Sequence, residues 1–159
     1  MTDPLAPELE FAFEARLKLR PRQRIDGLPR GGDRLGVAIS EGVFKGPNIS
    51  GTIIPGGGEW PHIRTDGVFC FDARYNLKED DGTIILLQNS GYRHASPEVM
   101  ERLYALRPGD VVESSEYYFR CTPIFDVAAG KHDWLTRHVF IGVGSRDEHG
   151  NLIRYYKVC

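Results

Sequence analysis

The stretch VFCFDARYNLKEDDGTIILLQN, residues 68–89, decides the fold. Apolar side chains fall on every second position of Val68–Leu77, which places them on one face of a β-strand. The dipeptide Asp81-Gly82 favours a tight turn, and Thr83–Asn89 follows as the returning strand. The run Ile84–Leu87 is apolar at every position, so we expect this strand to lie centrally with both faces covered. The stretch therefore predicts an antiparallel hairpin inside a larger sheet.

The same two-residue period occurs near the N-terminus, in Leu9–Leu19. We expect one buried face there, made of Leu9, Phe11, Phe13, Ala15, Leu17 and Leu19. Further strands are predicted at Leu35–Ile39, Gly46–Ile54, Tyr117–Asp126, Arg137–Gly144 and Leu152–Val158. One helix, Pro97–Leu106, is predicted with Ser96 as its cap. This pattern predicts an all-β protein, a closed antiparallel barrel of about eight strands with one short helix.

Composition fits a single domain spanning residues 1–159. Twenty Lys and Arg residues against 22 Asp and Glu give no global electrostatic case for nucleic acid or an anionic membrane. The Arg-, Gly- and Pro-rich residues 20–34 are expected to form a mobile loop with solvated arginines. The N-terminus lacks a signal-peptide pattern and the three cysteines lack a framework spacing. We therefore expect a cytoplasmic protein with reduced thiols, and leave homo-oligomerisation open.

Motifs for metals and cofactors are not found in the sequence. The five histidines form no H-x-x-x-H pair, so no metal site is expected. Gly142-Val143-Gly144 lacks the third glycine and the helix of a dinucleotide loop, and no phosphate-binding loop occurs. Ser90-Gly91 lacks the leading glycine of a nucleophile elbow. The sequence predicts chemistry without a cofactor.

Several short blocks follow one another along most of the chain. They are Gly46-Pro47, Ile54–Gly57, Glu59-Trp60, Arg64–Gly67, Asp72–Tyr75, Asp81-Gly82, Asn89, Gly91, Arg93, Tyr118–Arg120, Pro123, Phe125, Trp134-Leu135, Arg137 and Phe140–Gly144. Together they resemble domain-of-unknown-function family 3237, also called uncharacterised protein family 0311, from about Phe11 to Val158. The resemblance implies a small closed β-barrel similar to the allene-oxide-cyclase and dirigent barrels, and it supplies no general activity. The family usually has Asp after its Gly-Gly-x block, where this chain has Glu59.

Glu59 is the first candidate for acid–base chemistry. It follows three consecutive glycines, Gly56–Gly58, which suggest either a tight backbone path or a flexible loop. Trp60 beside it could remove water from the carboxylate and raise its pKa, so that Glu59 exchanges a proton near neutral pH. The alternative is an ordinary acid on a surface loop. We expect Glu59 and Trp60 to lie over one mouth of the barrel.

Two opposite faces of Val68–Leu77 carry competing candidates. Tyr75 shares a face with the phenylalanines, whereas Asp72 and Arg74 lie on the other face. If the second face lined the interior, Asp72 would be the base and Tyr75 structural; otherwise Asp72 and Arg74 form an external ion pair. Arg120, amid three aromatic residues, could bind a carboxylate or enolate oxygen or form a structural ion pair.

These residues predict a small-molecule site inside the barrel. Its expected catalytic residues are Glu59, Tyr75, Arg120 and Asp72, and its expected substrate-binding residues are Trp60, Arg64, Tyr118, Phe125 and Trp134. The predicted function is a cofactor-independent lyase or isomerase acting on a small, partly apolar carbonyl or hydroxyl compound. The alternatives are a barrel that binds such a ligand without catalysis, and a structural barrel filled by its own side chains.

Overall fold

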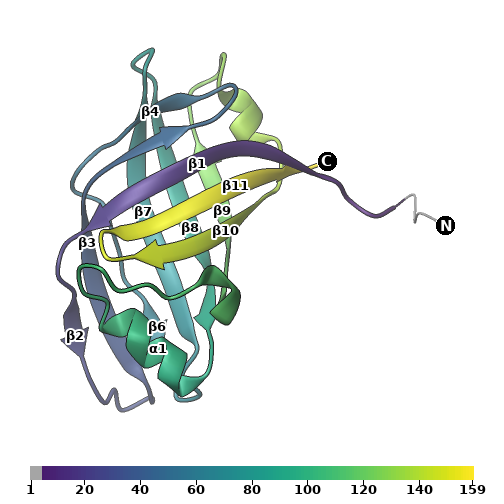
Figure 1. The fold of residues 1–159 in the computed structure, drawn as a ribbon. Helices are drawn as coiled ribbons and strands as arrows, with labels where there is room; N and C mark the ends of the chain where they lie inside the picture. Colours follow the sequence, from purple (N-terminus) through teal and green to yellow (C-terminus); the bar gives the residue numbers. More distant parts are fainter. Residues whose placement is uncertain (1–4) are drawn as a thin grey trace.

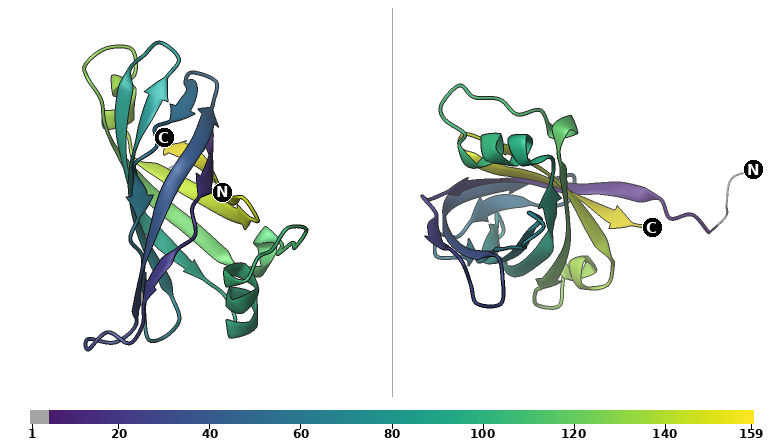
Figure 2. Two further views of the ribbon diagram at one scale, coloured as in Figure 1. Left: turned by 90° about the vertical axis from the view of Figure 1, so that its left-hand side faces the viewer. Right: turned by 90° about the horizontal axis from the view of Figure 1, so that it is seen from below.

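The computed structural model describes residues 5–159, which form a closed antiparallel barrel of eight strands with short additional strands and one α-helix (Figures 1 and 2). The wall strands are β1 (Leu9–Leu19), β3 (Asp33–Lys45), β4 (Ser50–Ile53), β7 (Phe69–Glu79), β8 (Ile84–His94), β9 (Tyr118–Asp126), β10 (Phe140–Asp147) and β11 (Gly150–Val158). The remaining elements are β2 (Gln23–Ile25), β5 (Gly58–Glu59), β6 (His62–Ile63), the helix α1 (Pro97–Tyr104) and the 3₁₀ turns η1 (Ser114–Glu116) and η2 (Asp133–Thr136).

Pairing between β1 and β3 closes the barrel. The wall runs β1-β11-β10-β9-β8-β7-β4-β3, and β3 then pairs with β1. Both β5 and β6 pair with β3 and with β7, so they continue the place of β4 along the wall. In Figure 1 the end with β4 lies at the top and the end with β6 and α1 at the bottom; we call them the upper and lower ends. The predicted barrel is confirmed.

The hairpin of residues 68–89 forms as predicted. Strands β7 and β8 pair continuously from Phe69 opposite Arg93 to Lys78 opposite Ile84. The alternate residues of β7 from Phe69 to Leu77, including Tyr75, are all buried in the barrel. The expectation for Ile84–Leu87 needs correction, because 47% of Ile84 is exposed and only Ile85 and Leu87 are fully buried. The outer face of β8 therefore remains in contact with solvent at Ile84.

The alternation of β1 is interrupted by a β-bulge. Phe11 lies opposite Tyr156 and Phe13 opposite Tyr155, so Ala12 has no partner of its own. Because of the bulge, Ala12 points into the barrel, and the apolar residues before it lie on the outer face instead of the expected inner face. Leu9 and Phe11, which were expected to be buried, are therefore 52% and 40% exposed, whereas Phe13 is fully buried.

Several element ends also differ from the predicted ones. Strand β8 continues to His94 and β10 to Asp147, both beyond their predicted ends, while α1 ends at Tyr104. Residues 20–34 include the edge strand β2 rather than being loop throughout. Among residues 5–159, no helix is long and apolar enough to cross a membrane.

Candidate active site

A pocket of about 330 Å³ opens at the lower end of the barrel, beside α1. Its apolar lining comes from Leu19, Leu35, Val37, Phe69, Tyr104 and Leu106. Its charged or titratable lining comes from Arg20, Arg22, Glu59, Arg93, Arg146, Glu148 and His149. The volume lies at the low end of the range for small-molecule sites. This pocket joins an acid and several arginines to an apolar wall.

Glu59 enters the pocket because its short strand is held tightly between two others. It lies opposite Val37 of β3 and Ala73 of β7. A Cβ at Gly57 would lie 2.5 Å from Tyr75 Cβ, and one at Gly58 would lie 2.7 Å from the Val37 carbonyl oxygen. These glycines therefore permit a close approach, as one of the two sequence interpretations held. The result is a glutamate that is only 9% exposed.

The carboxylate of Glu59 is buried without a direct partner. Within residues 5–159 it forms no hydrogen bond and no ion pair. Burial raises its pKa, and the positive charges of Arg93 and Arg146 only partly oppose that rise. A glutamic acid in this state holds its proton at a higher pH than an exposed one does, which suits a group that exchanges a proton near neutrality.

Arg93 reaches the pocket from the end of β8. It continues the inward face that carries Leu87 and Asn89, and it is 4% exposed. Its guanidinium carbon lies 4.2 Å from the centre of the Phe69 ring. Its Nε has no hydrogen-bond partner among the described residues. Burial and, to a smaller extent, the positive charge of the nearby Arg146 lower the pKa of Arg93 to about 10.

Arg146 reaches the pocket from the end of β10, on the face that follows Gly142 and Gly144. Its Nη1 donates to Asn151 Oδ1 at 3.3 Å, and its backbone N–H donates to the Tyr117 hydroxyl at 2.9 Å. Its buried Nε has no partner in residues 5–159. Burial lowers the pKa of Arg146, and the charge of Glu59 opposes that change. Two guanidinium groups thus face a pocket in which neither has an ion-pair partner among residues 5–159.

A polar layer lies deeper in the barrel, under Glu59. The hydroxyls of Tyr75 and Tyr155 lie 3.3 Å apart, and Asn89 Nδ2 donates to Tyr155 at 2.9 Å. A small cavity of about 10 Å³ lies between this layer and Glu59, which is close to the volume that one water requires. Burial raises the pKa of Tyr75, so its phenol stays protonated. The layer supplies hydroxyl groups beneath the acid.

Trp60 does not shield Glu59 as expected. Consecutive residues of an extended segment point to opposite faces, so Trp60 lies outside the barrel and is 51% exposed. The barrel wall itself removes water from Glu59. Burial inside the barrel, and not the Trp60 ring, is thus the cause of the raised pKa of Glu59.

Asp72, Arg74 and Arg120 lie on the outer face. All three are exposed, because they alternate with inward residues of β7 and β9. Arg120 lies over the Tyr118 ring at 5.3 Å and donates to the Phe119 carbonyl oxygen at 3.0 Å. The condition under which Asp72 would be the base, an inward-facing strand face, is not met. The structure does not bring these residues together with Glu59.

The other expected binding residues also lie away from the lower pocket. Arg64 pairs with Asp66 at the surface, and Tyr118 is 44% exposed. Phe125 packs in the core against Phe140, with ring centres 5.3 Å apart. Trp134 lines a different hollow of about 640 Å³ at the upper end.

That upper hollow is larger than the lower pocket, but the charged side chains Glu10 and Lys157 in its lining are already paired. Glu10 and Lys157 in its lining neutralise each other across 3.0 Å. The lower pocket instead contains Glu59, Arg93 and Arg146, which form no ion pair within the described residues, and the Nε atoms of both arginines lack a hydrogen-bond partner there. We therefore place the candidate site in the lower pocket.

Sequence reasoning missed Arg93, Arg146 and Asn151 as site residues. The predicted strands ended at Asn89 and Gly144, so the alternation was stopped before it reached either arginine. Continuing it by two steps from Asn89, and by one step from Gly144, places both arginines on the inward face.

A family model described as "Protein of unknown function (DUF3237)" matches residues 7–158. The chain belongs to this DUF3237 family. It is 34% identical to a UPF0311 protein of Clostridium acetobutylicum over 127 residues, 80% of this chain and 78% of that relative. The crystal structure of a conserved protein of unknown function from Rhodopseudomonas palustris has a TM-score of 0.88 and 26% identity, covering 100% of both chains.

One relative of this DUF3237 protein has an activity in its name. It is the hydroalkoxylation enzyme phnH of Penicillium herquei, which is 26% identical over 155 residues, 98% of this chain and 86% of that relative. A distant homologue is therefore an enzyme, and the barrel fold is compatible with a lyase-like function.

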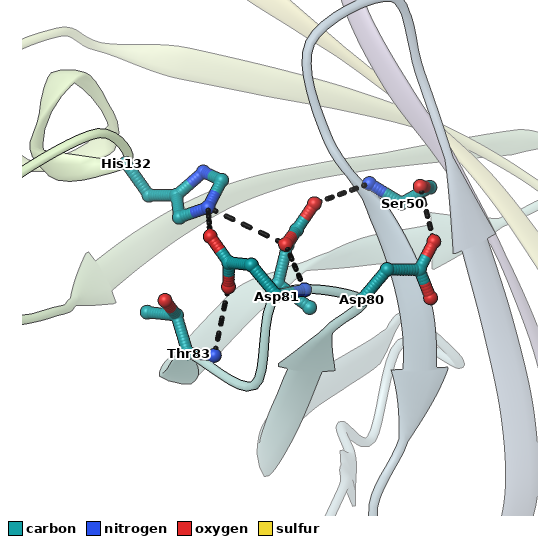
Figure 3. Close-up of polar contacts among 6 residues, drawn as sticks. Ser50, Asp80, Asp81, Thr83 and His132 are labelled. Atoms are coloured by element: carbon teal, nitrogen blue, oxygen red, sulfur yellow. Dashed lines mark hydrogen bonds and ion pairs between the residues drawn. The ribbon is translucent and has the colours of Figure 1, made fainter.

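A second polar cluster lies at the upper end of the DUF3237 barrel (Figure 3). Metal-binding atoms of Glu79, Asp81 and His132 lie within 4.8 Å of one another. His132 Nε2 is 2.7 Å from Asp81 Oδ2 and 3.5 Å from Glu79 Oε2. The backbone N–H groups of Asp81 and Thr83 donate to these carboxylates at 2.7 and 2.9 Å. The hydrogen bond from Thr83 and then His132 lower the pKa of Asp81.

These contacts connect the β7–β8 turn of the DUF3237 protein to the segment that leads into η2. Sequence spacing did not reveal the cluster, since His132 is 51 residues from Asp81. The backbone donors and the histidine already use the carboxylate oxygens. The cluster therefore holds two loops together, and we call Glu79, Asp81 and His132 the clasp.

Proposed function

We propose that this protein is a cofactor-independent lyase or isomerase that moves a proton through Glu59 in the lower pocket. One observation carries the proposal. Glu59 is buried without a hydrogen-bond partner in the described part of the chain, its pKa is raised, and it lines the same pocket as Arg93 and Arg146. Enzymes combine a carboxyl group of this kind with cations that stabilise a developing oxyanion. Asp72 and Arg120 are left out of the proposed site.

A balanced reaction follows from these groups for a substrate with a hydroxyl and a C=C bond conjugated to a carbonyl. The hydroxyl gives its proton to the Glu59 carboxylate as its oxygen bonds to the far alkene carbon. The alkene electron pair moves toward the carbonyl oxygen, and the resulting enolate is stabilised by Arg93 or Arg146. Glu59 then delivers the proton to the carbon beside the carbonyl. The reverse reaction is an elimination, and proton transfer alone gives an isomerisation.

The named activity of the Penicillium relative supports this class of reaction, because a hydroalkoxylation adds an O–H bond across a C=C bond. No co-reactant is required for such a step. Tyr75 lies beneath Glu59 and stays protonated, so it belongs to the polar floor of the site rather than to its bases.

The test uses an extract of small molecules from the native cells in deuterated water. Wild-type protein should convert a compound in the extract or add deuterium to it, as detected by mass spectrometry. Glu59→Gln should lower this rate by about 10²-fold or more, since an amide cannot carry the proton. Asp72→Asn, on the outer face of the adjacent strand, should retain the wild-type rate.

Equal rates for wild type and Glu59→Gln would contradict the role of Glu59. Absence of conversion and exchange with wild-type protein, combined with a compound retained in native mass spectrometry, would favour the alternative of a non-catalytic binding barrel.

A further inference from the structure

The lower pocket is positively charged although the whole chain has a net charge of −2. Four arginines and two glutamates contribute to its lining, namely Arg20, Arg22, Arg93, Arg146, Glu59 and Glu148. We propose that this pocket binds an organic carboxylate, with its anionic group held by Arg93 and Arg146 and its apolar body against the surrounding wall. The inference rests on the proposed function, because it names the substrate class of the same site.

Arg93 is the strongest indication of an anionic ligand. A guanidinium that is 4% exposed loses most of its hydration, and such groups are normally paired. The guanidinium carbon of Arg93 lies 4.2, 5.8 and 5.7 Å from the ring centres of Phe69, Tyr104 and Phe119, and the guanidinium also interacts with the Tyr104 side chain. Its Nε has no acceptor within residues 5–159. A ligand oxygen would supply that acceptor.

Arg146 provides the second half of the anion site. Its Nη1 uses one amide oxygen, that of Asn151, and its Nε has no partner among the described residues. Besides burial, the positive charge of Arg146 lowers the pKa of Arg93, and that of Arg22 lowers the pKa of Arg146, so the cations of this pocket repel one another. An anion between Arg93 and Arg146 would reduce this repulsion and accept charge-assisted hydrogen bonds from both.

The acids of the pocket do not neutralise these arginines. Glu148 lies 3.1 Å from His149 Nε2 and also accepts from the backbone N–H of Gly109. Within residues 5–159 Glu59 makes no ion pair, and burial raises its pKa, so it carries its negative charge over a narrower pH range than an exposed glutamate does. The positive charge therefore remains available to a ligand.

The remaining lining favours a carboxylate attached to an apolar body over a free inorganic anion. Leu19, Leu35, Val37, Phe69 and Leu106 provide apolar surface around a volume of about 330 Å³. An inorganic phosphate would leave that surface in contact with water only, whereas an aromatic or unsaturated acid would cover it.

Benzoate is a suitable probe, because it joins one carboxylate to a small apolar ring. We expect saturable benzoate binding in ¹H–¹⁵N NMR titrations of the full chain, with shifts confined to residues around the lower pocket. Neutral benzamide, of nearly the same shape, should bind at least about tenfold more weakly, which is the usual size of a charge-assisted contact. Inorganic phosphate at the same ionic strength should bind more weakly than benzoate.

Variants then assign the contacts. Arg93→Met and Arg146→Met should each weaken benzoate binding at least about tenfold. Arg93→Lys, which keeps the charge but loses the planar fork, should fall between wild type and Arg93→Met. Arg154→Met, a control arginine paired with Glu14 on the outer face, should bind as wild type does. Dispersed NMR spectra and thermal midpoints of every variant establish that the fold is intact.

The outcomes separate this inference from the proposed function. Glu59→Gln should bind benzoate at least as tightly as wild type does, because an amide cannot carry the negative charge that Glu59 acquires when it loses its proton. If both Arg→Met variants and benzamide bind like wild type with benzoate, the carboxylate inference is overturned even where Glu59→Gln abolishes turnover. Phosphate binding without benzoate binding would overturn it as well. Conversely, Arg-dependent benzoate binding with full turnover by Glu59→Gln would overturn the proposed function alone.

Discussion

Glu59 shows how a strand of only two residues can determine the environment of a side chain. Its backbone pairs with β3 and β7 simultaneously, so the carboxylate has no freedom to turn outward. The neighbouring Trp60, one residue further on, is outside the barrel. The environment of each residue is thus fixed by strand parity rather than by closeness in sequence.

The raised pKa of Glu59 has a consequence for stability. Its pKa in the folded protein lies above the ordinary value of 4.5, so the folded state keeps the proton to a higher pH than the unfolded state does. The free energy of unfolding of wild type, relative to Glu59→Gln, should therefore decrease as the pH rises from about 4.5 through the folded pKa, by up to about 1.4 kcal/mol per pH unit. Above the folded pKa the difference should become constant. Urea unfolding at several pH values measures it, and a difference that grows with pH would contradict the assignment.

Arg93 should favour ligand binding at the expense of the stability of the ligand-free protein. Arg93→Met keeps a long apolar stem against Phe69 but removes a buried charge that has no ion-pair partner within residues 5–159. Replacing buried charge by apolar atoms often stabilises a protein, and we expect a gain of about 1–3 kcal/mol in the ligand-free protein despite the lost contacts with aromatic rings. Chemical denaturation measures the change, with Arg154→Met expected within about 0.5 kcal/mol of wild type. A loss of stability in Arg93→Met would show that the guanidinium is well compensated without a ligand.

At the scale of elements, periodicity predicted the barrel, but not where each strand stops or breaks phase. The β7–β8 hairpin followed from alternation and from Asp81-Gly82, which are local signals. The bulge in β1 left no mark in the sequence, because Phe11, Ala12 and Phe13 are all apolar and either register is locally acceptable. Of the four expected catalytic residues, the structure places Glu59 at the lower pocket and Tyr75 beneath it, while Asp72 and Arg120 lie outside. Which side chains meet at one end of the barrel depends on barrel closure and strand register, and the periodicity of a single strand reveals neither.

The bulge can be tested with two substitutions on the same strand. Phe13→Asp should lower the free energy of unfolding by about 3 kcal/mol or more, because it buries an unpaired charge among Phe44, Phe125 and Tyr155. Phe11→Asp should lower it by less than about 1.5 kcal/mol, since Phe11 is 40% exposed and loses mainly its edge contact with Tyr156. Thermal and urea unfolding provide both values. Similar losses at the two positions would mean that the strand keeps one phase throughout.

At the scale of the whole molecule, the two ends of the barrel differ in how their charged and polar side chains are arranged. The lower end gathers Glu59, Arg93 and Arg146 around a pocket, and none of the three forms an ion pair within residues 5–159. The upper end joins its loops through Glu79, Asp81 and His132, which contact one another. Phe69 at the pocket and Glu79 at the clasp are the first and last residues of β7, so about 33 Å of strand lies between them. A packed core that includes Leu77, Ile85 and Tyr155 fills the space between the two ends. Changes at the clasp should therefore affect stability without affecting the pocket.

The clasp should act without a metal ion. Two ligands of one tetrahedral zinc ion lie about 3.3 Å apart, yet His132 Nε2 and Asp81 Oδ2 are 2.7 Å apart, which is a hydrogen-bond distance. We therefore expect treatment with a chelator to leave the thermal midpoint unchanged and elemental analysis of the purified protein to find no stoichiometric zinc or iron. Either metal at one equivalent per chain would contradict this expectation and make the three side chains its ligands.

His132→Phe tests the separation of the two ends. The phenyl ring keeps the buried volume but cannot hydrogen-bond to Asp81, and it leaves the buried Glu79 with one partner fewer. We expect a loss of about 1–2 kcal/mol in the free energy of unfolding, with less than about 1 kcal/mol for the exposed neighbour His138→Phe. Benzoate affinity should be unchanged in both variants, because neither alters Arg93 or Arg146. A weaker affinity in His132→Phe would require the clasp to influence the lower pocket through the core, and would replace two independent ends by one coupled barrel.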